Sequence, residues 1–374
     1  MNIRFSFLYK EGIMQMGILG LPLSGKTTLF NILTLGHASI GISPSRKDVN
    51  RGIAEVPDSR LIALSEKLSD RKLIYSSVEY VDVAGVSKGE GQSEWFNTGV
   101  RVHLQTTDAI ILVIRDFASD IVPHPDGSVD ALRDLSMLEA ELILSDLMIL
   151  ETRIGKLEKK HQSLTPDEHH ELELLTKCKD ALEHEKPLRG LSFSGEEAKK
   201  LRGFQFLTEK PLLVALNVGA SGLKTGEQTA NRIRESLGVG ATEVCVITGD
   251  IELEMKDLEP EDIAAFLEDL GVNTPARERI LRTSYHLLGL QSFFTQNENE
   301  IRAWAFHRGA TAPQAAGVVH TDIERGFIRA EVVHVDDFLK CGSFAHCREA
   351  GVLRLEGRDY IVKDGDLIQF RFNV

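Results

Sequence analysis

Short apolar or β-branched runs alternate with amphipathic stretches along most of the chain. The runs lie at residues 16–19, 78–83, 109–114, 211–216 and 244–247. Continuous runs of this length are typical of strands covered on both faces. Their alternation with helical stretches predicts an α/β fold with a doubly wound, mainly parallel sheet. Such a sheet binds its ligand at the C-terminal ends of its strands.

Residues 131–203 follow a different pattern. Apolar residues recur there at alternating spacings of four and three, and more leucines lie beyond a polar turn at residues 163–166. This spacing predicts an antiparallel helical hairpin of coiled-coil type. The hairpin falls between two predicted strands, so we expect an insertion into one domain formed by residues 14–130 and 204–290. The repeating residues are Ile143, Leu147, Leu150, Ile154, Leu157, Leu172, Leu175 and Leu182.

From residue 291 the chain changes to short β-rich runs separated by Gly and Asp turns. One helical stretch, residues 312–318, lies between the second and third runs. This order predicts a separate C-terminal domain, residues 291–374, in which a small mixed sheet wraps around one helix. The predicted strands are residues 292–295, 301–306, 327–335, 359–362 and 367–372.

Composition narrows the classes of function. A net charge of -13 opposes a surface built to bind nucleic acid, so we expect no DNA partner and only local contact with RNA. The four cysteines lack paired spacing, which indicates a reducing compartment and favours the cytoplasm. No apolar run reaches about eighteen residues, so we expect no membrane span. Met14 precedes the first strand, and we expect residues 1–13 to be a non-native or disordered extension.

The chemistry is concentrated at residues 20–27, which spell GLPLSGKT between a predicted strand and a predicted helix. This G-x-x-x-x-G-K-T pattern is typical of a phosphate-binding loop, whose backbone N–H groups converge on phosphate at the positive end of the helix. Lys26 supplies a charge between the terminal phosphates, and the Thr27 hydroxyl can ligate Mg²⁺. We therefore expect residues 23–28 (Leu23, Ser24, Gly25, Lys26, Thr27 and Thr28) to bind nucleotide. A chance match in a glycine turn is the alternative.

A second motif follows in the order expected of a switch-type nucleotide hydrolase. The polar stretch 43–50 lacks periodicity and predicts a mobile loop, and the run at 78–83 leads into Asp82-Val83-Ala84-Gly85. Asp82 can hold the magnesium shell through water, and the Gly85 N–H can sense the γ-phosphate. A tight turn without function is the alternative for an isolated Asp-x-x-Gly.

These motifs resemble the Obg-like ATPase family, in its YchF branch. The resemblance rests on GILGLPLSGKTTLFNILT, VEYVDVAGVSKGEG, RAWAFHRGATAPQAAGVVHTDIERGFIRAEV and LRLEGRDYIVKDGDLIQFRFNV, and it covers residues 14–374. It implies a P-loop nucleotide hydrolase of the cytoplasm associated with ribosomes or translation, with an inserted hairpin and a C-terminal TGS domain of β-grasp fold. Family members commonly favour ATP over GTP.

The chain departs from the wider pattern at the phosphates. Leu23 stands where related loops usually carry an Asn that can help to bind potassium, so we do not expect potassium activation through this residue. Arg46 stands where the mobile segment normally offers a Thr to magnesium. Val86 follows Gly85 where many GTPases carry a water-positioning Gln, and an apolar side chain cannot orient water. We therefore expect slow hydrolysis.

The base site is also altered. A guanine-specific site ends in a carboxylate that accepts two N–H bonds from the base, whereas here the segment is Asn217-Val218-Gly219-Ala220. Leaving those two N–H groups unpaired costs roughly 1 to 3 kcal/mol each. We expect Asn217 and Val218 to lie at the base, with ATP preferred or weak selectivity between ATP and GTP. An Asn that merely ends a strand is the alternative.

The sequence thus predicts a slow nucleotide-triphosphate switch. Lys26 and Gly85 are the catalytic candidates, and Thr27 and Asp82 are the Mg²⁺ candidates. The expected partners are ATP or GTP and the ribosome or ribosomal RNA, with Arg325 and Arg329 on one face of a strand as candidate RNA contacts. A scaffold that binds nucleotide without significant turnover is the alternative function.

Overall fold

The computed structural model describes residues 13–36, 49–68, 71–83, 98–119, 121–160, 163–238, 240–255, 258–269 and 272–373. The predicted extension up to residue 12, together with Arg46, Gly85 and Val86, lies outside these ranges. Contacts divide the chain into two compact units. One contains residues 14–53 and 79–287, and the other contains residues 54–78 and 288–374.

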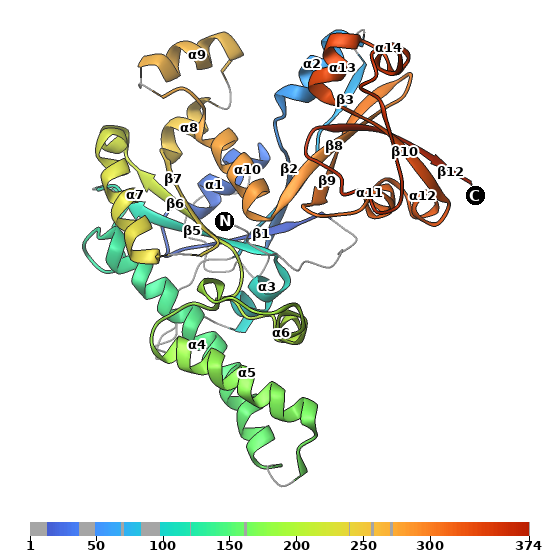
Figure 1. The fold of residues 1–374 in the computed structure, drawn as a ribbon. Coiled ribbons are helices and arrows are strands. Elements are labelled where there is room, and N and C mark those ends of the chain that lie inside the picture. Colours follow the sequence, from blue (N-terminus) through green and yellow to red (C-terminus); the bar gives the residue numbers. More distant parts are fainter. Residues whose placement is uncertain are drawn as a thin grey trace. The chain divides into compact units, whose positions relative to one another are not determined.

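The first unit is built on a six-stranded sheet of order β2-β4-β1-β5-β6-β7. Strands β1, β2, β5, β6 and β7 are labelled in Figure 1. The pairs from β4 through β1, β5 and β6 to β7 are all parallel, which confirms the predicted α/β class. Residues 212–218 of β6 are buried without exception, as a strand covered on both faces requires. The strands are β1 Gln15–Leu19, β2 Asn50–Glu55, β4 Ser77–Asp82, β5 Ala109–Asp116, β6 Leu212–Val218 and β7 Thr242–Ile247.

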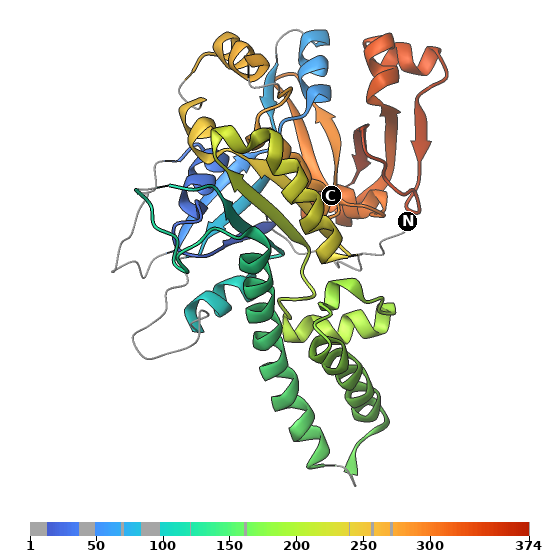
Figure 2. The ribbon, with the colours of Figure 1, turned by 90° about the vertical axis from the view of Figure 1, so that its left-hand side faces the viewer.

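The predicted hairpin is formed by α4 Ala131–Glu158 and α5 Pro166–Glu183, which run antiparallel in Figure 2. Asp130 caps α4 by accepting from two backbone N–H groups, and Thr165 forms a capping box with Glu168 at the start of α5. An apolar seam holds the two helices together. It includes Leu150, Ile154, Leu157, Leu174, Leu175 and Leu182.

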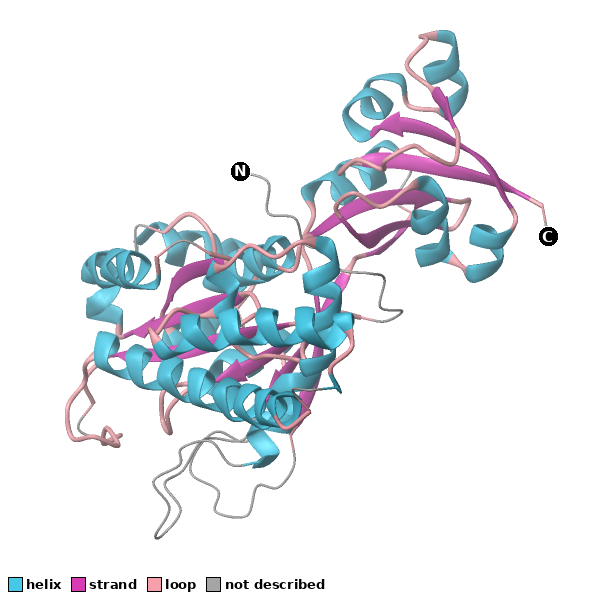
Figure 3. Ribbon diagram, turned by 60° about the horizontal axis from the view of Figure 1, so that its bottom comes forward, coloured by secondary structure: helices cyan, strands magenta, loops and turns pink. Residues whose placement is uncertain are grey.

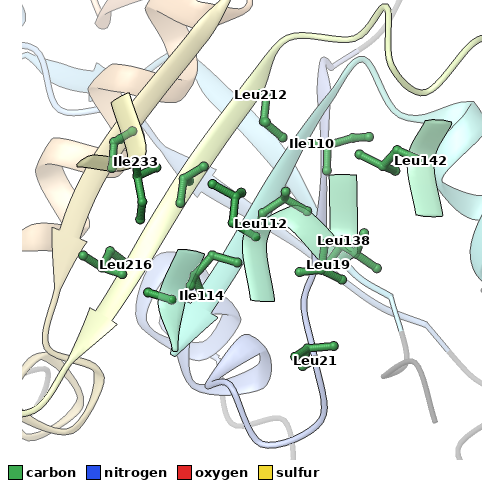
Figure 4. Packing of buried hydrophobic residues seen from close by; sticks show 14 of the residues in the cluster. Leu19, Leu21, Ile110, Leu112, Ile114, Leu138, Leu142, Leu212, Leu216 and Ile233 are labelled. Atoms are coloured by element: carbon green, nitrogen blue, oxygen red, sulfur yellow. The ribbon is translucent and has the colours of Figure 1, made fainter. Parts of the chain in front are cut away.

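Helices lie on both sides of the first sheet (Figure 3). Leu138 and Leu142 show that the first half of α4 packs on β5 rather than on α5 (Figure 4). The base of the hairpin is therefore part of the core of the first sheet. The remaining helices of this unit are α1 Lys26–Thr34, α3 Thr98–Thr106, α6 Gly195–Leu201, α7 Leu223–Leu237, α8 Gly249–Met255, α9 Pro260–Asp269 and α10 Ala276–Leu287, with short 3₁₀ turns at Leu188–Gly190, Arg202–Phe204 and Ala220–Gly222.

The second unit contains a mixed sheet of order β11-β10-β12-β8-β9-β3. Pairs β10–β11, β10–β12 and β8–β9 are antiparallel, whereas β12–β8 and β3–β9 are parallel. Its helices are α2 Ser59–Lys67, α11 Ala312–Val319, α12 Thr321–Arg325, α13 Val335–Cys341 and α14 Phe344–Glu349. Its strands are β3 Lys72–Ile74, β8 Leu290–Gln296, β9 Glu300–His307, β10 Phe327–His334, β11 Arg354–Glu356 and β12 Asp366–Phe372.

A cluster of buried residues lies on each face of this second sheet, so the expectation of one wrapped helix was incomplete. Phe293 packs in a cluster with α11, while the next residue, Phe294, packs in a cluster with α2 and α13. Helix α2 and strand β3 come from residues 54–78, which the sequence did not assign to this unit. Arg60 anchors them, because its guanidinium pairs with Asp58 and Asp364 at 2.8 Å each. The predicted domain limits remain a proposal.

Two local predictions in the C-terminal region were wrong. Residues 359–362 form no regular strand: Tyr360 N–H closes a turn on Gly357, and Ile361 makes one isolated bridge to Thr311. Arg325 ends α12 and is not on a strand with Arg329, because β10 begins at Phe327. Among the described residues, no helix is both long enough and apolar enough to cross a membrane.

Candidate functional site

The predicted phosphate loop joins the end of β1 to the start of α1. Two glycines are required by geometry. A Cβ on Gly20 would lie 2.5 Å from the carbonyl oxygen of Val113, and a Cβ on Gly25 would overlap the amide of Asn217. Gly25 also has φ 101°, a conformation that side chains rarely adopt, while its carbonyl accepts the first helical bond from Leu29 N–H. The sequence therefore produces a tight turn that presents the N-terminus of α1.

Lys26 lies inside this loop and is only 7% exposed. Its Nζ donates to the carbonyl oxygen of Leu21 at 2.7 Å. Burial lowers the pKa of the Lys26 ammonium to about 8, and the negative charge of Asp82 opposes part of that change. Leu23 takes φ 61°, the left-handed region that favours glycine and asparagine. The loop thus holds its cation in a desolvated position beside a carboxylate.

Asp82 ends β4 and is 3% exposed. The Thr27 hydroxyl donates to its Oδ2 at 3.0 Å, so the two predicted magnesium candidates meet although they lie far apart in the sequence. Asn50 Nδ2 donates to the same oxygen at 3.0 Å. The sequence placed Asn50 in a mobile loop, whereas it is the first residue of β2, and its contact with Asp82 was missed.

Asn217, on β6, ties the phosphate loop to the start of α8. Its Nδ2 donates to the Ser24 carbonyl at 3.0 Å, and its Oδ1 accepts from Gly249 N–H at 3.0 Å. Asn217 is therefore more than the end of a strand. Its neighbour Val218 is 3% exposed and packs in the core, so only its backbone can face a ligand. A Cβ on Gly249 would lie 3.3 Å from Thr28, which places Thr28 beside this second loop.

A buried hydrogen-bonded pair that sequence reasoning missed lies behind the loop. His124 Nε2 contacts Asp134 Oδ2 at 2.9 Å, and His124 Nδ1 accepts from Asp126 N–H at 3.2 Å. Since Nδ1 is an acceptor, Nε2 carries the proton and donates to Asp134. His124 and Asp134 line a small pocket together with Ser24, whose Oγ is buried with no partner among the described residues. His124 lies in a loop and Asp134 in α4, and no sequence motif links the two residues.

Comparisons with known proteins cover the whole fold. Residues 290–373 match the family model YchF-GTPase_C, described as a protein of unknown function (DUF933). The chain is 41% identical over 361 residues to the "Ribosome-binding ATPase YchF" of Bacillus subtilis (strain 168), and this match covers 96% of the chain and 99% of the relative. The chain belongs to the YchF family.

Further YchF proteins agree with this placement. The protein of the same name from Escherichia coli O157:H7 is 37% identical, with 96% of the chain and 99% of the relative covered. The solved structure of the Schizosaccharomyces pombe YchF GTPase matches with a TM-score of 0.85 at 26% identity, over 97% of this chain and 99% of that one. The resemblance to the Obg-like ATPases in their YchF branch is confirmed, and so is the P-loop fold.

Proposed function

We propose that this YchF family member is a nucleotide-triphosphate switch that hydrolyses its nucleotide slowly and associates with the ribosome. The observation that carries the proposal is the meeting of three groups at the N-terminus of α1. The Lys26 ammonium, the Thr27 hydroxyl and the Asp82 carboxylate lie together, although Lys26 and Thr27 begin α1 and Asp82 ends β4. The bacterial relatives' names, ribosome-binding ATPase, support the activity and the partner.

The donor set fits Mg²⁺, which prefers a few protein oxygens and completes its shell with phosphate and water. Thr27 offers a hydroxyl oxygen and Asp82 a carboxylate. When bound, the ion would neutralise charge on the phosphates. Lys26 is the residue we assign to the terminal phosphates, with the backbone N–H groups of residues 23–28 surrounding them. Gly85 is our candidate for sensing the γ-phosphate.

Selectivity for the base follows from residues 217–220. Asn217 already binds Ser24 and Gly249, and Ala220 offers no carboxylate to the two N–H groups of guanine. We therefore propose a preference for ATP or weak selectivity between ATP and GTP. Val86, in place of a water-positioning Gln, supports slow turnover. The proposed location is the cytoplasm, and contact with ribosomal RNA would be local because the chain carries a net charge of -13.

Phosphate release from ATP, with Mg²⁺ and with the ion chelated, tests the proposal. We expect measurable release that depends on Mg²⁺ and is abolished in Lys26→Ala, while Lys199→Ala, an exposed lysine on α6, behaves as the parent chain does. Unchanged release and unchanged nucleotide affinity in Lys26→Ala would overturn the mechanism. Tight binding with no release would favour the alternative, a scaffold that binds nucleotide without turnover.

A further inference from the structure

Asn50 makes a contact that the proposed function does not use. Its amide Nδ2 donates to Asp82 Oδ2 at 3.0 Å, and the Thr27 hydroxyl donates to the same oxygen at 3.0 Å. The donors belong to different elements, because Asn50 begins β2 and Thr27 lies in the first turn of α1. The carboxylate of Asp82, a residue that is 3% exposed, is therefore held from two sides.

We propose that Asn50 is a positioning residue that fixes the Asp82 carboxylate for Mg²⁺ bound with the nucleotide, an inference that rests on the proposed function. A carboxylate turns easily about its last torsion, which is broad and roughly two-fold. Two donors on Oδ2 fix the carboxylate plane. No hydrogen bond from the described residues reaches Oδ1, so this oxygen is left to accept from the hydration shell of a cation. Holding a ligand in its binding geometry beforehand reduces the entropy lost on binding.

The chemistry of the two donors suits this role. A Thr hydroxyl has one hydrogen and two lone pairs, so Thr27 can donate to Asp82 and still offer an oxygen to the metal. An Asn amide donates without carrying charge. Asn50 therefore holds the carboxylate without neutralising it, whereas a Lys or Arg at this position would compete with the cation for the same negative charge.

The position of Asn50 also limits what its loss would disturb. It is half-buried at the start of the strand, and within the described part of the chain its side chain hydrogen-bonds with Asp82 alone. The other contacts of the phosphate loop do not involve Asn50. Lys26 donates to the Leu21 carbonyl, and Asn217 donates to the Ser24 carbonyl. Removing the Asn50 amide should therefore change the metal requirement more than the affinity for nucleotide without metal.

Binding of a fluorescent N-methylanthraniloyl ATP to the full chain, titrated with Mg²⁺ and repeated in a chelator, tests the proposal. Asn50→Ala removes the donor, and Asn50→Leu removes it while keeping the volume. Loss of a hydrogen bond to a charged group predicts that both variants need about tenfold more Mg²⁺ for half-maximal binding. In chelator their affinity should stay within about twofold of the parent chain. Ile53→Ala, an exposed residue on the same strand, is the matched control.

An unchanged Mg²⁺ requirement in both variants would overturn the positioning role. Equal loss of affinity with and without Mg²⁺ would also overturn it, because it would indicate a structural effect on the whole site, which thermal unfolding of the same samples would register. Absence of Mg²⁺-dependent binding in the parent chain is a different result. It would refute the proposed function itself and is seen before any variant is compared.

Discussion

Asn217 is the residue at which the loop geometry can be tested most directly. Its side chain joins the Ser24 carbonyl to Gly249 N–H, with both hydrogen bonds at 3.0 Å, and it is 5% exposed. Replacement by Ala removes both bonds and leaves a buried acceptor and a buried donor without partners. The change acts on the phosphate loop from outside and leaves Lys26 and Thr27 intact.

The size of the effect follows from these two contacts. A buried group left unpaired costs roughly 1 to 3 kcal/mol, so two such groups predict a loss of about 2 to 4 kcal/mol in the free energy of unfolding when part of the penalty is relieved by water. Nucleotide affinity should fall by at least about tenfold, equivalent to about 1.4 kcal/mol, because Ser24 lies within the turn that presents backbone N–H groups to phosphate.

Denaturant unfolding and calorimetric titration with ATP and Mg²⁺ measure the two effects on Asn217→Ala. Asn299→Ala is the control, since this side chain is exposed and lies in the other unit. A change below about 0.5 kcal/mol in unfolding, together with affinity within about twofold, would refute the view that this amide supports the loop.

Three further changes test other parts of the chain. Leu23→Asn should raise the free energy of unfolding by about 1 kcal/mol, because Asn tolerates φ 61° better than Leu; a lower denaturation midpoint would contradict this. Burial raises the pKa of Asp146 to about 6 and that of Glu209 to about 7, so the folded chain binds these protons more tightly than the unfolded chain does. The contribution of these two groups to the free energy of unfolding should therefore be fully present below the unfolded values near about 4 and be lost as the pH rises through about 7. Glu209→Gln should flatten the upper part of that fall in unfolding measured from pH 5 to 8. Ala220→Asp supplies the missing acceptor for guanine and should shift the affinity ratio toward GTP by about tenfold in paired titrations; an unchanged ratio would remove Ala220 from the base site.

The sequence pointed to those candidate residues that lie in local motifs. Lys26 and Thr27 lie in one motif whose spacing is set by the turn, and Asp82 could be placed because it ends a β-rich run. Asn50 could not be predicted, since its contact with Asp82 spans 32 positions and the residues before it show no periodicity. The pair of His124 and Asp134 was missed for the same reason: a loop and a helix meet there through tertiary packing.

For the fold, too, the sequence predicted the elements that have a local pattern and missed the placement that depends on distant residues. Apolar runs indicated the strands of the first sheet, and the four-three spacing indicated the hairpin, because both patterns repeat within a few residues. Residues 54–78 carry an amphipathic helix and a short strand that fit either unit by pattern alone. Their placement depends on distant partners, such as the pairing of Lys72 with Glu300 across β3 and β9.

The interleaving of residues 54–78 with the C-terminal sheet has a consequence for how the chain is made. The ion pair of Arg60 with Asp364 spans 304 positions, and Leu61 and Leu64 are fully buried against residues from the end of the chain. During synthesis the apolar side chains of this early segment stay uncovered until the last strands, which supply their packing partners, have been made. The final residues therefore complete an early part of the molecule, and a chain that stops short would lack partners near its beginning as well as its end.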